Sequence, residues 1–86
     1  MARLIQLTMT GTRQQLTTSQ IYSPFVTIQN NGTNQIRCGD NTVTSTKGIV
    51  IFATGSYTIQ RSDNRVPLFT RYVIGTAGDK VDIDYE

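Results

Sequence analysis

The chain has 86 residues, which suits one domain, and so small a core usually needs support from oligomerisation or a partner. Its single cysteine excludes a disulfide within the chain, and the lack of histidine argues against a zinc site and removes the commonest general base. The net charge of +2 comes from 8 Lys and Arg against 6 Asp and Glu, scattered rather than clustered in the basic stripe typical of nucleic-acid-binding proteins.

Alternation of apolar and polar side chains, the period of a β-strand, begins at Arg3 and continues to Thr10. The same alternation recurs in Phe25–Gln29 and in Ile36–Cys38. Ile49–Phe52 is apolar throughout and short enough to be a strand buried on both faces. These segments predict the strands of the first half of the chain.

The second half continues the pattern. Alternation around Tyr57 and Ile59 predicts a strand, and Leu68–Ile74 is rich in β-branched and aromatic residues. In Val81–Glu86 every second residue is acidic, so Asp82, Asp84 and Glu86 stand in a row on one face. We expect a solvated outer face that also blocks edge-to-edge aggregation, and the alternative is an acidic ladder that pairs with a basic patch on a neighbour.

Turn-forming residues separate these segments, at Asn30–Gly32, Gly39–Asn41, Lys47–Gly48, Thr54–Gly55, Asp63–Asn64 and Gly75–Asp79. No segment shows the helical period. The sequence therefore predicts an all-β fold: a small antiparallel β-sandwich, jelly-roll-like, with seven or eight short strands. We expect one domain over residues 1–86, with the N-terminal segment as a candidate arm.

Reactive groups are scarce. Cys38 shares a face with Ile36 and is expected to be a buried, free thiol. The carboxylates of residues 79–86 could in principle act as a pair, but so small a module has little room for a cleft. Oxygen ligands for calcium at Asp40 and Asn41, or at Asp79 and Asp82, lack EF-hand spacing and are better explained by turns. We predict that the chain is not an enzyme and takes no cofactor and no metal.

Three further patterns are weaker. Asn31–Thr33 fits a glycosylation sequon, but a hairpin turn explains it as well. Phe69, Arg71 and Tyr72 come closest to a site for single-stranded nucleic acid, but alternation puts Tyr72 on the opposite face. No stretch approaches the roughly 20 apolar residues of a membrane span, and the N-terminus does not read as a signal peptide. We therefore expect no nucleic acid, no membrane, and synthesis in a reducing cytoplasm.

Longer motifs carry a resemblance to a known family. The chain reads VTIQNNGTNQIRCGDNTVT over residues 26–44, KGIVI over 47–51 and YVIGTAGDKV over 72–81. In this it resembles small virion proteins of tailed bacteriophages, of the capsid decoration or cement type. The resemblance implies a β-sandwich on the outer capsid surface, made in the bacterial host cytoplasm. It also implies two partners: the major capsid protein and further copies of the chain, most often as a homotrimer that bridges capsomers.

Two other hypotheses remain open. The chain could be a phage tail or fibre component that contacts a receptor or a glycan, with Tyr22 and Tyr57 as stacking rings beside the loop of residues 61–65. It could also be a non-viral adaptor or the accessory domain of an enzyme.

Partner contacts are predicted in two regions. The first is the N-terminal segment with Arg3, Arg13 and Gln14, because the termini of small coat modules often extend to a neighbour. The second is the polar loop of residues 61–67, with Arg61, Asp63 and Arg65, because arginine is enriched at interfaces. The alternative for this loop is plain solvation.

Overall fold

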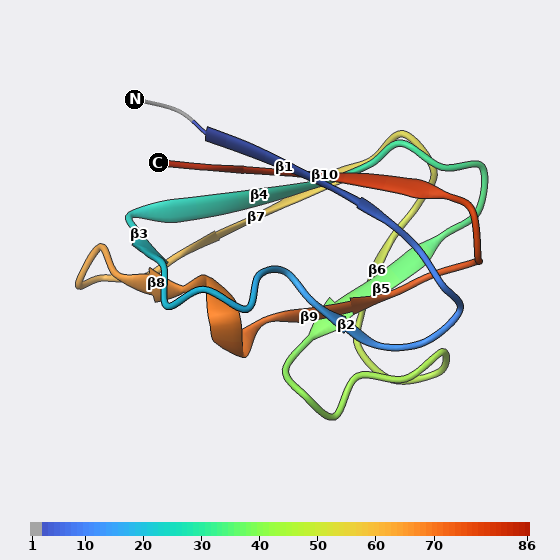
Figure 1. The fold of residues 1–86 in the computed structure, drawn as a ribbon, viewed down its shortest axis with the longest axis horizontal. Helices are drawn as coiled ribbons and strands as arrows, with labels where there is room; N and C mark the ends of the chain where they lie inside the picture. Colours follow the sequence, from blue (N-terminus) through green and yellow to red (C-terminus); the bar gives the residue numbers. More distant parts are fainter. Residues whose placement is uncertain (1–2) are drawn as a thin grey trace.

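Two four-stranded antiparallel sheets make up the computed structural model, which describes residues 3–86 (Figure 1). The first sheet has the order β1 (Arg3–Thr8), β10 (Lys80–Tyr85), β4 (Phe25–Asn30), β7 (Ser56–Gln60). The second has the order β2 (Gln14–Gln15), β9 (Tyr72–Ile74), β5 (Ile36–Gly39), β6 (Ile49–Ile51). A small pair, β3 (Tyr22–Ser23) with β8 (Val66–Pro67), and the 3-10 turn η1 (Leu68–Thr70) close one end.

The connections between strands define the topology. The links β1 to β2, β4 to β5, β6 to β7 and β9 to β10 each carry the chain from one sheet to the other. Eight strands wound in this way form a jelly roll. The predicted all-β antiparallel fold is confirmed. The described residues form ten strands, more than the seven or eight expected, because the two-residue strands β2, β3 and β8 were not predicted.

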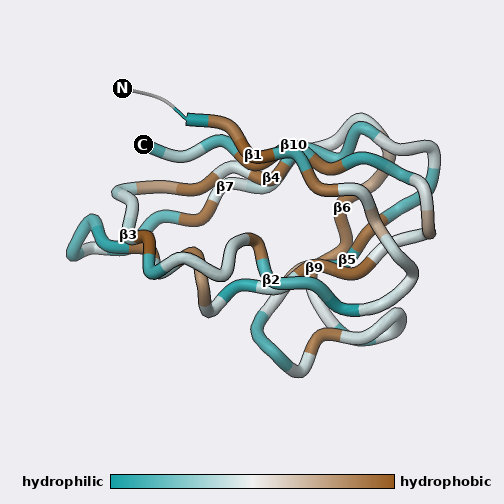
Figure 2. Tube along the Cα trace, in the orientation of Figure 1, coloured by the Kyte–Doolittle hydropathy of each residue, from teal (hydrophilic) through white to brown (hydrophobic). Residues whose placement is uncertain are grey.

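The core lies between the sheets and is filled by the inward side chains that alternation predicts. On β4 and β10 these are Val26, Ile28, Val81, Ile83 and Tyr85, and β5 and β9 contribute Ile36, Cys38 and Val73. Hydrophobic colour follows parts of β1, β5 and β6, and hydrophilic and hydrophobic segments alternate along β10 (Figure 2). Burial of one such aliphatic side chain stabilises the fold by roughly 1.5–3 kcal/mol.

The polar side chain of Asn30 is fully buried at the end of β4 and fixes the corner where β6 turns into β7. Its amide nitrogen donates to the carbonyl oxygens of Asn34 and Ile51, at 2.9 and 3.0 Å. Its Oδ1 accepts from the backbone N–H of Gly32 at 2.9 Å. Because buried amides are costly unless they are bonded, these contacts explain why an Asn is tolerated here.

Two strand predictions were wrong. Ile49–Phe52 is not buried on both faces: β6 is an edge strand, and Ile49 and Phe52 are 44% and 70% exposed. Leu68–Ile74 is not one strand, because the Arg71 N–H bonds to the Leu68 carbonyl and forms η1 before β9 begins. Local hydrogen bonds here override β-propensity.

The single-domain and arm predictions stay predictions. Arg3 already belongs to β1, where it pairs with Tyr85, so an arm would fall on residues 1–2, which lie outside the described part of the chain. Within residues 3–86 no helix has the length and hydropathy that a membrane crossing requires.

Candidate interaction surfaces

The carboxylates considered as calcium ligands take part in local hydrogen bonds. Asp40 Oδ1 accepts from the hydroxyl and the N–H of Thr42, at 2.5 and 2.8 Å, and these bonds hold the pKa of Asp40 below its usual value. Asp79 accepts from the backbone and side-chain amides of Asn34, both at 3.2 Å. Across residues 3–86 no three His, Cys, Asp or Glu side chains gather as a metal site would require.

Cys38 lies in the core, 2% exposed, as the sequence predicts. Burial raises the pKa of its thiol to about 11, and the charge of Arg71 opposes that shift. At neutral pH the group is therefore a protonated thiol that neither attacks substrates nor exchanges disulfides readily.

Asp82 and Asp84 lie on the outer face of β10 and are half-buried, and Glu86 follows the strand, while Val81, Ile83 and Tyr85 face the core. Gln6 donates to Asp82 at 2.8 Å, and Asn31 also donates to this carboxylate. The prediction that these acidic residues block edge-to-edge aggregation was wrong, because β10 is not an edge strand and lies between β1 and β4. The role of the row in pairing with a basic neighbour stays a prediction.

The residues of the first predicted contact region do not form one surface. Arg3 opens the edge strand β1. Gln14 is held within the chain, since its Nε2 donates to the Thr8 carbonyl at 3.2 Å and its Oε1 accepts from the Thr10 N–H at 3.3 Å. Arg13 reaches over the second sheet toward the Val43 carbonyl, 3.4 Å from its Nη1.

In the second predicted region, residues 61–67, Val66 and Pro67 form β8 and are not part of a loop. The remaining loop of residues 61–65 is partly ordered by its own charges. Arg61 and Asp63 form an exposed ion pair at 3.3 Å, and Asp63 Oδ1 accepts from the Arg65 N–H at 3.1 Å. The Arg65 guanidinium lies 4.4 Å from the centre of the Tyr22 ring, which meets Phe69 edge-on at 5.4 Å. The loop is therefore a structured surface whose role as a contact stays a prediction.

The two tyrosines proposed to stack on a sugar are partly occupied by the chain itself. Tyr22 is exposed, but Arg65 covers its ring. Tyr57 is half-buried and packs against the core from β7. Each ring is thus partly engaged within the chain, and the glycan hypothesis stays a prediction.

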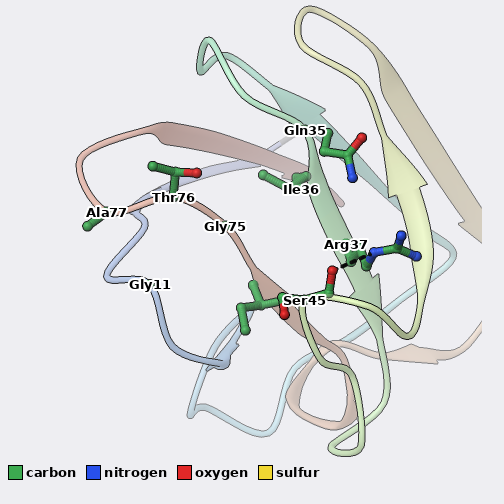
Figure 3. A pocket seen from close by; sticks show the side chains of 9 residues that line it. Gly11, Gln35, Ile36, Arg37, Ser45, Gly75, Thr76 and Ala77 are labelled. Carbon is green, nitrogen blue, oxygen red and sulfur yellow. Dashed lines mark hydrogen bonds between the residues drawn. The ribbon is translucent and has the colours of Figure 1, made fainter.

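A depression of about 420 Å³ lies near the link from β9 to β10 (Figure 3). Its lining consists of Gly11, Gln35, Ile36, Arg37, Ser45, Ile74, Gly75, Thr76 and Ala77. Arg37 Nε donates to the Ser45 carbonyl at 3.0 Å, and its Nη1 donates to the Gly48 carbonyl at 3.1 Å. These nine residues include no carboxylate, thiol or imidazole, so the lining offers no acid–base pair.

Sequence reasoning missed a surface that we call the uncharged side, formed by residues 49–60. It comprises β6, the turn of residues 52–55 and β7, so it contains an edge strand of each sheet. No residue in it is charged or proline, and Ile49 and Phe52 are exposed. Edge strands of soluble proteins are usually blunted by charge, proline or a cover, and here the first two are missing. The lack of charge over twelve residues was the available signal.

Comparison with known proteins gives the fold and no family. No protein-family model and no curated protein sequence matches the chain. Among solved structures, it is similar to a chain of the Bacillus endospore appendages, described as a novel family of disulfide-linked pili. The TM-score is 0.51 at 19% sequence identity, over 98% of this chain and 83% of that chain. A likeness at this identity supports the all-β fold alone.

Proposed function

We propose that the chain is a structural subunit of a larger protein assembly and acts by holding neighbouring subunits. The uncharged side carries this proposal. It exposes Phe52 and Ile49 beside two unpaired strand edges, a combination that is typical of surfaces covered by other protein.

The specific assembly that we propose is a bacteriophage head, with the chain as a decoration protein bound to the outer surface of the major capsid protein. The motifs of residues 26–51 and 72–81 support it through their resemblance to small virion proteins. A module bound across the seam between capsomers adds buried apolar area, at about 25 cal/mol per Å², that must be exposed again before the seam opens. Many copies multiply this effect.

The pilus neighbour supports only the general part of the proposal. Its fold serves in an extracellular appendage, so a jelly roll of this kind is compatible with assembly outside a cell. Its pili are disulfide-linked, whereas the single cysteine of this chain, Cys38, is buried. We therefore propose that this chain assembles through non-covalent contacts.

The test measures the mass of the purified protein and its binding to particles. If the gene lies in a phage genome, empty heads of that phage are mixed with the protein, and co-sedimentation is expected to saturate at a fixed ratio to the capsid protein. Charge reversal of Arg61 and Arg65 in a second sample tests whether the 61–65 loop takes part. A protein found only on tails would overturn head decoration, and one that binds neither itself nor any particle would overturn the structural role.

A further inference from the structure

The edge strand β7 has free backbone hydrogen-bonding groups. The Asn30 N–H donates to the Gly55 carbonyl, and the Asn30 carbonyl accepts from the Thr54 N–H. The backbone groups of Asn30 therefore face the β7 side of β4. Because these directions alternate along an antiparallel strand, the β4 partners of Tyr57 and Ile59 also face β7. The backbone N–H and C=O groups of Ser56, Thr58 and Gln60 then point away from the sheet.

We propose that β7 of a second copy of this chain pairs antiparallel with β7 about a two-fold axis at Thr58. The sequence of β7, Ser-Tyr-Thr-Ile-Gln, is complementary to itself in this register. Thr58 meets Thr58 of the second copy, Ser56 meets Gln60, and Tyr57 meets Ile59. The outward backbone groups of Ser56, Thr58 and Gln60 then all find partners, and the two sheets become one.

The side chains suit this pairing on both faces. On the inner face, Tyr57 and Ile59 are half-buried at the edge of the core, and an aromatic ring opposite a β-branched side chain is a favourable cross-strand pair. On the outer face the pairs are polar and neutral, so no like charges oppose each other. The Thr58 hydroxyl is 2.9 Å from that of Thr27, which fixes its rotamer before a partner arrives.

A second copy is the favoured occupant for a reason of symmetry. In a two-fold contact one surface covers itself, so no complementary patch is needed elsewhere on the molecule. Ile49 and Phe52 lie on the same uncharged side and are exposed. The other edge of the first sheet, β1, begins with the charged Arg3 and is a poorer template for self-pairing.

The decisive test is cross-linking through Thr58→Cys. A hydrogen-bonded antiparallel pair has Cα atoms about 5.5 Å apart, which lies within the range that a disulfide spans. Ser56→Cys is the matched control, because in this register the two Ser56 residues lie about 14 Å apart along the strands. The native Cys38 is buried and stays silent. We expect mild oxidation to convert Thr58→Cys to a covalent dimer and to leave Ser56→Cys monomeric on a non-reducing gel.

A backbone substitution gives an independent measurement. Thr58→Pro removes an N–H that faces outward, so β4 keeps its bonds to β7, and proline is tolerated on edge strands. We expect at least a tenfold weaker dimer for Thr58→Pro by analytical ultracentrifugation, with Thr58→Ser unchanged. The inference would be overturned by cross-linking of Ser56→Cys as efficient as that of Thr58→Cys, or by a dimer unaffected in Thr58→Pro.

The inference rests on the proposed structural role, and the outcomes separate the two. A trimer in solution, or a monomer that still binds phage heads, would overturn the β7 pairing and leave the structural role standing. A monomer that binds no particle would overturn both.

Discussion

Replacement of Asn30 by aspartate tests the account of the buried corner. The change keeps the shape of the side chain but replaces its amide nitrogen by an oxygen, which then faces the carbonyl oxygens of Asn34 and Ile51. The two donated bonds are lost, each worth about 1 kcal/mol, and two acceptors are left unsatisfied in the core. We expect a loss of about 3 kcal/mol or more at neutral pH, a large share of the roughly 5–15 kcal/mol that holds a small domain together.

The same variant should depend on pH in a defined direction. A buried carboxyl that faces carbonyls has a pKa raised above its unfolded value of about 3.9, because burial disfavours the charged form. Its destabilisation is therefore largest at neutral pH and is relieved as the pH falls through the raised folded-state pKa, since the protonated form can donate one bond again. Asn30→Ala, which has no titrating group, is the control.

Urea denaturation of the wild type and both variants, at neutral pH and at about pH 4, measures these differences, with circular dichroism as the signal. If Asn30→Asp were as stable as the wild type at neutral pH, the role given to the amide would be refuted. So would a pH dependence equal to that of Asn30→Ala, because it would mean that the carboxyl titrates in solvent.

Three further predictions follow from the same contacts. Cys38 should react with a thiol reagent only when the protein unfolds. Because the pKa of its thiol is raised to about 11 in the folded state, the free energy of unfolding should fall as the pH rises above about 9. The Cys38→Ala variant should lack this pH dependence. Gly75→Ala should cost roughly 1–3 kcal/mol by urea denaturation, because the new Cβ would lie 2.7 Å from Ile36 Cγ2, whereas unchanged stability would show that the neighbours yield. Phe52→Ser should change the free energy of unfolding by no more than about 0.5 kcal/mol, since the ring is 70% exposed. It should nevertheless weaken self-association or particle binding measured by sedimentation, and unchanged assembly would show that the uncharged side is not part of the interface.

The period-two pattern predicted β4, β5 and β10 well. In β4, β5 and β10 the alternation assigns each inward residue correctly, because a one-residue shift would bring polar side chains into the core. Periodicity could not find β2, β3 and β8, since two residues do not make a period. These short strands form only because each pairs with a strand far away in the sequence, β2 with β9 and β3 with β8.

The main error in the predicted fold concerned the edge strand β6. A short apolar run such as Ile49–Ile51 is compatible with a central strand or with an edge, and only the count of neighbours distinguishes them. The same ambiguity hid the uncharged side. The predicted contact residues included Gln14 and Arg61, whose side chains are engaged within the chain. Sequence alone does not show which polar groups already have partners.

The place of β10 between β1 and β4 has a consequence for biosynthesis. The first sheet cannot close until residues 80–85 have left the ribosome. Strands β1 and β4 are not paired with each other, and only β10, which comes last along the chain, joins them. Until then β1 exposes Ile5 and Leu7 without a neighbour to cover them. We therefore expect folding to be slow for a domain of this size, as is usual when strands distant in sequence must meet first.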